Sequence, residues 1–414
     1  MSESIGDMFL NTKVPKKLLE DIEKKGDQKY NVLVKEVLYS EEKEEQTKEM
    51  VKEIYLNIID ILKKYLDLKE DYYPLIATWI IGTHCHKQFY TYPYLFLNAM
   101  KGSGKTRLLK LINILSNKSQ MLNSLTEAVL FRTEGTLCID EFEGITRNGC
   151  ENLRELLNSA YKKGTMVKRL RRVKAADGDK QEVESFLVYR PIVIANITGM
   201  ESVLGDRCLT LIIEKSSKSV ITSLIEMFEL DPIITSTLDL IRKSEVSEVK
   251  LPLEVYTQWN DYIIYKHHTS PTNNITKHHL MDKIYNAKID GRHLELALPL
   301  LVIAGYLGED ILDNILRILK DIVCIKKEDE FTDNIDVSVL DFISQYTSYD
   351  FRSVKELVKD FKGFTQLDEP WINERWFGRS LKRLALVIEK KHTNHGNYVR
   401  LDIIKAQQRI LMFK

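Results

Sequence analysis

The sequence predicts an α/β protein whose central part holds a largely parallel β-sheet. Apolar runs of strand length alternate with helical patterns, which is typical of strand–helix units. These runs lie at 94–99, 121–123, 136–140, 191–196 and 208–213. A loop with two glycines joins the first run to a helical pattern, as folds that bind phosphate require. The 414 residues, of which 44% are hydrophobic, suffice for a packed core and two or three domains.

The parts on either side of this centre are predicted to be mainly helical. Before it, apolar residues recur at helical spacing in a Lys/Glu-rich stretch, and Pro74 opens a second helix. After it, helices continue to an acidic link, and the chain ends in three helices and two β runs. We expect the parts to be an N-terminal helical region at 1–73, an α/β core at 74–215, a helical segment at 216–325 and a C-terminal domain at 337–414.

Composition excludes several classes of protein. No apolar run approaches the ~20 residues that span a bilayer, and the first residues lack the pattern of a signal peptide. The five cysteines are widely spaced and form no Cys-x-x-Cys pair, which argues against a disulfide framework or a cysteine zinc site. We therefore expect a soluble, cytoplasmic protein with no membrane partner.

The balanced charge conceals an uneven distribution. The chain has 60 basic and 60 acidic residues, so its formal net charge is zero. The first 70 residues carry an excess of acidic groups, whereas basic groups gather in a short central run and in the C-terminal domain. Because binding depends on where charge lies, the zero does not argue against a nucleic-acid partner.

The strongest chemical signal is the loop that follows the first predicted strand. Gly102 and Gly104 permit close approach of the backbone to phosphate, and Ser103 lies between them. Lys105 would neutralise the β- and γ-phosphates of ATP, and the hydroxyl of Thr106 would face Mg²⁺. The usual pattern has a glycine five residues before the Gly104–Lys105 pair, where this chain has Ala99. An alanine fits there if its φ is negative, so the predicted cofactors are ATP and Mg²⁺.

Two further strand ends carry polar groups suited to the same chemistry. Asp140 and Glu141 follow an apolar strand, which favours Asp140 in the magnesium shell and Glu141 polarising the attacking water. Asn196 ends the next strand and would orient that water; the alternative is an ordinary turn asparagine.

With these motifs in this order, and with Gly205–Ile212 after them, the sequence resembles an AAA+ ATPase core of the P-loop NTPase class. It is most similar to the superfamily 3 and MCM-type helicases of phages, plasmids and other mobile elements, often associated with primase-polymerases. The stretches at 124–132, 153–159 and 291–296 also resemble that group. The similarity covers 74–323 and implies that 216–325 is a helical lid.

The resemblance implies roles for further residues. Lys105 and Thr106 match the first ATP motif, in which Arg107 follows directly. Arg207 matches an arginine finger that reaches the ATP of a neighbouring subunit; the alternative is a surface ion pair with Asp206. Arg292 matches the second sensor, on the lid. A shared site of this kind implies a homo-oligomeric ring, a hexamer in this group, and a separate primase-polymerase partner.

A basic β-hairpin is predicted over 162–189, just before the strand that ends in Asn196. Its cations would follow a DNA backbone without reading bases. They are Lys168, Arg169, Arg171, Arg172 and Lys174. The alternative is a solvated hairpin in which these groups pair with Glu182 and Glu184. By alternation, Arg169 and Arg171 share one face of the strand, so the five cations cannot all contact one DNA strand.

The C-terminal domain is predicted to be a winged helix. Its basic helix would bring Arg379, Lys382 and Arg383 to a groove of DNA, with three further basic residues at 390–392 on the wing. Winged helices also serve as protein–protein modules, which is the alternative. The histidines at 84, 86, 267, 268, 278 and 279 have no ligand spacing and are expected to be structural.

Together these features predict a Mg²⁺-dependent ATPase that acts on single-stranded or forked DNA as a ring helicase or translocase in the replication of a mobile element. One alternative is an initiator or loader ATPase that remodels DNA without processive unwinding. The other is a non-catalytic winged-helix DNA-binding protein with a vestigial nucleotide site.

Overall fold

The computed structural model describes the backbone of residues 28–140, 151–175, 178–197, 200, 202–267, 279–333, 335–393 and 396–413. The chain divides into two compact units, Met1–Ile318 (unit 1) and Leu319–Lys414 (unit 2). No helix among the described residues is long and apolar enough to cross a membrane.

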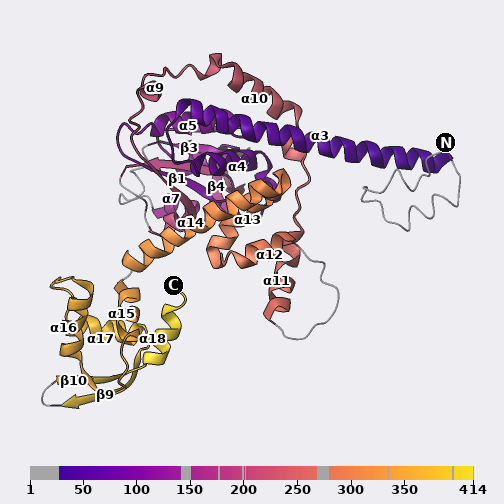
Figure 1. Cartoon of the computed structure of the whole chain (residues 1–414). Helices are drawn as coiled ribbons and strands as arrows, with labels where there is room; N and C mark the ends of the chain where they lie inside the picture. The colour runs from indigo at the N-terminus through magenta and orange to yellow at the C-terminus, as the bar shows by residue number, and fades with distance from the viewer. Residues whose placement is uncertain are drawn as a thin grey trace. The chain divides into compact units, whose positions relative to one another are not determined.

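A five-stranded parallel sheet forms the centre of unit 1 (Figure 1). Its strands are β1 (Tyr94–Ala99), β2 (Gln120–Leu122), β3 (Leu137–Ile139), β6 (Ile192–Asn196) and β7 (Cys208–Ile213). They lie in the order β2-β3-β6-β1-β7, and every pairing is parallel. Each strand matches one predicted apolar run, which confirms the α/β class. The inner strands β1 and β6 are apolar and buried because helices cover both faces of the sheet.

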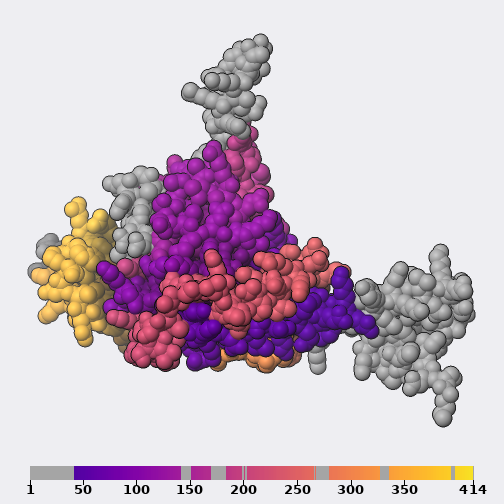
Figure 2. Space-filling model, turned by 90° about the horizontal axis from the view of Figure 1, so that it is seen from above, coloured from indigo at the N-terminus to yellow at the C-terminus, as the bar shows by residue number. Residues whose placement is uncertain are grey.

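Helices surround this sheet in unit 1. They are α3 (Gln28–Tyr65), α4 (Tyr72–Cys85), α5 (Lys105–Leu115), α6 (Glu127–Arg132), α7 (Glu151–Ala160), α8 (Ser202–Gly205), α9 (Ser219–Thr222), α10 (Pro232–Lys243), α11 (Glu254–His267), α12 (His279–Asn286) and α13 (Gly291–Leu307), with 3₁₀ turns η1 (His86–Gln88), η3 (Phe228–Leu230) and η4 (Val246–Glu248). Helix α14 (Glu309–Asp333) begins in unit 1 and continues into unit 2. Helix α5 packs on β2, β3 and β6. The long helix α3 contacts α4, α5, α10 and α13, and Figure 2 shows α10 lying along it.

The helices outside the central segment belong to the same compact unit as the sheet. Residues 74–215 therefore do not separate from α3 or from the helices between residues 216 and 318. The acidic segment 326–336, expected as a link, is helical as far as Asp333. Its Lys and Glu residues are good helix formers, so α14 continues through it. The division between the units falls after Ile318 instead.

A two-stranded hairpin stands apart from the main sheet. Strands β4 (Met166–Ala175) and β5 (Gly178–Leu187) pair only with each other among the described strands, in antiparallel register. The predicted hairpin is thus present, and the base of the hairpin projects from the body of unit 1 in Figure 2.

Unit 2 combines helices with a small antiparallel sheet. Its elements after α14 are α15 (Ile335–Ser344), β8 (Arg352–Ser353), α16 (Val354–Thr365), α17 (Glu374–Arg383), β9 (Val387–Thr393), β10 (Gly396–Leu401) and α18 (Ile403–Ile410). The strands lie in the order β8-β10-β9. Phe361 and Phe377 are fully buried in a core to which all four helices contribute. The predicted three helices and two β runs are present, with α18 added at the end.

Candidate nucleotide site and cationic surfaces

The glycine loop lies where the carboxyl end of β1 meets the first turn of α5. Gly102 and Gly104 have φ values of +79° and +84°, which only glycine adopts without strain. The helix begins at Lys105, so the first backbone N–H groups of α5 lack partners in their own helix and favour an anion. Parallel α/β sheets bind ligands at this edge, beyond the carboxyl ends of their strands.

Three predicted side chains meet at this loop. Lys105 Nζ lies 2.9 Å from Asp140 Oδ1, and the Thr106 hydroxyl donates to Asp140 Oδ2 at 2.8 Å. Asp140 follows β3, two strands away from β1 in the sheet, and its own N–H donates to the carbonyl of Leu122. The ammonium, hydroxyl and carboxylate that ATP and Mg²⁺ need are therefore at one point.

The loop borders a pocket of about 520 Å³. Its walls are the loop itself, the end of α3 at Tyr65–Asp67, and the segment 215–226 after β7. The Ser103 hydroxyl is buried in the loop and has no hydrogen-bond partner among the described residues. A buried polar group without a partner is costly, and a bound phosphate oxygen would accept this hydrogen bond. The residues present thus fit a nucleotide phosphate with Mg²⁺ beside Thr106 and Asp140.

The other two predicted residues of this site are Glu141 and Asn196. Glu141 lies outside the described residues. Asn196 ends β6 opposite Asn98 of β1, is buried, and accepts a hydrogen bond from Ile197 N at 2.7 Å through Oδ1. A local contact of this kind is what the alternative, an ordinary turn asparagine, predicts for Asn196. The strand that it ends, β6, lies between β1 and β3 in the sheet.

Comparison with models of known protein families gives no match, and comparison with curated proteins gives none either. The function has to be argued from these residues.

Arg107 points away from the loop. Its guanidinium donates to the carbonyls of Ile221 (2.8 Å), Leu224 (2.9 Å) and Tyr65 (3.3 Å), and it pairs with Glu226. These contacts fasten the segment after β7 to the end of α3, because one side chain bridges both. Arg107 lines the pocket, as expected of an ATP-binding residue, but the structure gives it a wall-forming position instead of a phosphate contact.

Arg207 and Arg292 gather at the opposite edge of the sheet. Arg207 precedes β7, and its carbonyl accepts from the N–H of Tyr94, the first residue of β1. The strand β1 is six residues long, so its two ends are ~17 Å apart. Both arginines lie against the ring of Tyr161, which follows α7. The structure therefore does not bring them to the loop of their own chain.

The predicted DNA-binding residues of the hairpin lie on β4. The register sets Arg169 opposite Glu184 and Arg171 opposite Glu182, as the alternative for this hairpin requires. Lys168, by contrast, lies opposite Ser185 and is exposed. Arg172 lies opposite Gln181, and Lys174 lies opposite Asp179. The side chains of 169–182 are outside the description.

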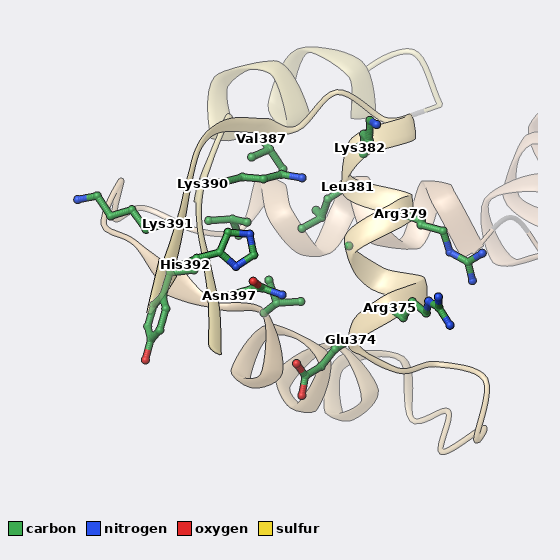
Figure 3. A pocket seen from close by; sticks show the side chains of 14 residues that line it. Glu374, Arg375, Arg379, Leu381, Lys382, Val387, Lys390, Lys391, His392 and Asn397 are labelled. Carbon is green, nitrogen blue, oxygen red and sulfur yellow. The ribbon is translucent and has the colours of Figure 1, made fainter. Parts of the chain in front are cut away.

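In unit 2, a groove of about 280 Å³ separates α17 from the β9–β10 pair. Figure 3 shows Lys390 and His392 reaching from β9 toward α17, whereas Lys391 points away from the groove. Arg375 and Arg379 project from the other side of α17, and Lys382 lies near its end. A cationic surface thus wraps the helix and the strand, and sequence reasoning had not included Arg375.

Arg383 is not part of this groove. It forms a fork with Asp336, with Nε to Oδ2 at 2.8 Å and Nη2 to Oδ1 at 2.5 Å. Burial raises the pKa of Asp336, but hydrogen bonds from Arg383 and Ser380 outweigh it and hold the pKa below its usual value. The geometry of Arg383 is that of a structural ion pair, in contrast to its predicted DNA contact.

The histidines near α4 serve the packing. His84 Nε2 lies 2.9 Å from the carbonyl of Leu115, and His86 Nδ1 lies 2.8 Å from that of Thr83. Burial lowers the pKa of His86 to about 4. Within the described ranges, no group of three or more His, Cys, Asp or Glu side chains is arranged to hold a metal. His268 and His278 lie outside those ranges.

Proposed function

We propose that the chain is a Mg²⁺-dependent ATPase that works on DNA as a ring-forming helicase or translocase. The meeting of Lys105, Thr106 and Asp140 at the carboxyl edge of a parallel sheet carries the proposal. This arrangement, in which Asp140 contacts both Lys105 and Thr106, favours a working site over a vestigial one.

Each group has a part in ATP hydrolysis. The N–H groups of the loop and Lys105 bind the phosphates, since they supply positive charge at a helix N-terminus. Mg²⁺, when bound, would supply positive charge that neutralises the phosphates. Thr106 and Asp140 hold that ion in place, and Asn196 orients the attacking water, whose proton Glu141 accepts.

The position of the arginines supports a shared site. Because Arg207 and Arg292 gather near the start of β1, whereas the loop follows its end, we assign them to the site of another copy. Head-to-tail contacts of this kind close into rings, and a hexamer is the form that we propose. The sheet and the helices after residue 216 are consistent with an AAA+ core and its lid.

Two cationic elements support a DNA partner. The base of the β4–β5 hairpin projects from unit 1, and the cationic surface around α17 and β9 is consistent with a winged helix in unit 2. Both present lysines and arginines suited to a phosphate backbone, which makes binding independent of sequence. We propose that ATP hydrolysis moves the hairpins along single-stranded or forked DNA, in replication of a mobile element with a primase-polymerase as partner.

An unwinding assay on forked DNA with 3′ or 5′ single-stranded tails tests this function. The wild-type chain with ATP and Mg²⁺ should separate the strands of one of the two forks. Glu141→Gln should bind nucleotide but not unwind, because it lacks the base for water. ATP hydrolysis without strand separation would instead indicate a loader or initiator, and the absence of hydrolysis would indicate a DNA-binding protein.

A further inference from the structure

The groove of unit 2, between α17 and the β9–β10 pair, has an apolar floor. Val354, Leu381 and Val399 line it, and all three are buried in the core of unit 2. The volume of about 280 Å³ is near the lower limit for small-ligand pockets, which is roughly 300 Å³. A single planar group can enter a space of this size, whereas a whole duplex cannot.

Gly378 keeps the groove open on the side of α17. It lines the groove in the middle of that helix, one turn from Glu374 and one turn from Lys382 on the same face. A Cβ at Gly378 would meet no atom within 4 Å, so the packing of the chain does not require a glycine there. A glycine inside a helix lowers stability. Its bare backbone instead suits close approach of a ligand.

Charge is unevenly placed along the groove. Lys382 and Lys390 lie toward the end of α17, because β9 begins four residues after that helix ends. Glu374, at the start of α17, is ~12 Å from Lys382 along the helix. The cross-strand partners His392 and Asn397 lie nearer to Glu374 (Figure 3). One end thus attracts phosphate, and the other offers a planar imidazole, an amide and a carboxylate.

This polarity matches a nucleotide better than an anionic peptide. A nucleotide has a phosphate at one end and a planar base with a hydrogen-bonding edge at the other. Unpaired bases stack on planar side chains such as histidine and are recognised through their edges. An acidic or phosphorylated peptide, in contrast, would meet the negative charge of Glu374 at one end of the groove.

The surface around the groove indicates a strand instead of a free nucleotide. Arg375 and Arg379 project from the other side of α17 (Figure 3). Within the described part of the chain, neither forms an ion pair, and Lys382 and Lys390 form none either. These cations are therefore available to the phosphates that flank a bound nucleotide in a continuous strand.

We propose that the groove holds one unpaired nucleotide of a DNA strand, with its base against Gly378. The ring of His392 stacks on this base, and Lys382 and Lys390 hold its phosphate. The inference rests on the DNA partner proposed above and deepens it, because it makes unpaired DNA the ligand of unit 2. It does not depend on ATP hydrolysis.

A matched pair of glycine variants tests the groove in the full chain without ATP. Gly378→Leu fills the groove. Gly363→Leu, the control, places the same side chain on α16 outside the groove, where a Cβ also meets no atom within 4 Å. Fluorescence anisotropy measures the affinity for a single strand, for a strand of equal length with abasic sites, and for a blunt hairpin duplex. The abasic strand keeps the phosphates and lacks the bases.

We expect Gly378→Leu to bind the single strand about tenfold more weakly than the wild type, the scale of one lost base stack. Its affinity for the abasic strand and for the duplex should equal that of the wild type, and Gly363→Leu should match the wild type with all three DNAs. Leucine is a better helix former than glycine, so neither variant should melt at a lower temperature.

His392→Ala is a second variant, at an exposed position that does not carry the fold. It removes the planar ring and leaves the groove open. We expect the affinity for the single strand to fall several-fold and the affinity for the abasic strand to stay unchanged.

Full affinity of both Gly378→Leu and His392→Ala for the single strand would overturn the inference. An equal loss with the abasic strand or the duplex would also overturn it, because the groove would then hold the DNA backbone. Binding of a labelled acidic peptide that Gly378→Leu abolishes would make the groove a protein-docking site instead.

The outcomes separate this inference from the function on which it rests. A wild-type chain that binds none of the three DNAs contradicts the proposed DNA partner together with the inference. DNA-stimulated ATP hydrolysis by the wild type, with full affinity of Gly378→Leu for the single strand, contradicts the inference alone.

Discussion

Lys105 and Asp140 form a buried ion pair in which Nζ lies 2.9 Å from Oδ1 and each side chain is 10% exposed. The loop lysine is thus held by the carboxylate that also accepts from Thr106. For Lys105 to bind phosphate, it has to leave Asp140, and a magnesium ion can then take its place on the carboxylate. In the proposed function, the pair would therefore couple nucleotide binding to metal binding.

Asp140→Asn should abolish ATP hydrolysis and raise nucleotide affinity in the absence of Mg²⁺. The amide cannot hold the metal ion as a carboxylate does, and it releases Lys105 from an ion pair that competes with phosphate. Titration of a fluorescent ATP analogue in EDTA measures the affinity, for which we expect a several-fold gain. Metal-dependent hydrolysis at the wild-type rate would show that Asp140 has no part in the site.

Arg107→Ala should weaken ATP binding more than turnover. The substitution leaves the carbonyls of Ile221 and Leu224 without a donor and loosens the pocket wall, at a cost of about 2 kcal/mol in the free energy of unfolding. We expect KM for ATP to rise about tenfold while kcat stays within about threefold. A loss of kcat at constant KM would mean that Arg107 contacts the transferred phosphate after all.

Two double variants of the hairpin make a matched pair, since each removes two positive charges. Lys168→Ala with Arg172→Ala removes cations that lie opposite Ser185 and Gln181. DNA should therefore stimulate ATP hydrolysis less. The slope of the logarithm of DNA affinity against the logarithm of salt concentration should fall by about the amount expected for two lost phosphate contacts.

The control is Arg169→Ala with Arg171→Ala, whose positions face glutamates across the hairpin. We expect its effect on DNA stimulation to be the smaller one. An equal or larger loss in this control would show that opposing carboxylates do not decide which cations meet DNA.

In unit 2, Arg383→Ala should lower stability and leave DNA binding unchanged. Arg383 is engaged with Asp336, so its removal costs about 1 kcal/mol of unfolding free energy. Arg379→Ala with Lys382→Ala should do the reverse, weakening DNA binding with an unchanged melting temperature. Fluorescence anisotropy and thermal melting of the full chain measure both. If Arg383→Ala weakens DNA binding and leaves stability unchanged, Arg383 contacts DNA as the sequence predicts.

The buried histidine predicts a pH dependence of stability. The pKa of His86 is lowered by burial from 6.5 to about 4, so the unfolded chain gains its proton at higher pH than the folded chain does. The contribution of His86 is complete above pH 6.5 and is lost as pH falls toward 4, by about 3 kcal/mol at most. Denaturant titrations at a series of pH values give the free energy of unfolding, and its dependence on pH between 4 and 6.5 should be steeper for the wild type than for His86→Phe. Parallel profiles would contradict the account.

The sheet and the loop were predictable because their signals are local. Each strand is an apolar run bounded by turns, and Gly102 and Gly104 supply the left-handed backbone that the loop adopts. Asp140 was also predictable, since parallel strands end at one edge of the sheet and polar residues at two such ends must approach each other.

The contacts of the arginines were not predictable from local signals. Arg107 directly follows the loop, but Ile221 and Leu224, whose carbonyls it binds, lie after β7, more than 100 residues away. Tyr161 carried no sequence signal at all, because its contacts come from two arginines brought to it by β7 and α13. Arg383 fits a basic helix face by spacing, and only the packing of α15 on α17 reveals Asp336 beside it.

The most direct test of the central claim is the rate of ATP hydrolysis by the wild-type chain and by Lys105→Ala, each with and without single-stranded DNA and Mg²⁺. Circular dichroism checks that the variant, whose Asp140 loses its buried partner, is still folded. The account predicts Mg²⁺-dependent hydrolysis that DNA stimulates in the wild type, and none in folded Lys105→Ala. Equal rates in the two chains would contradict it.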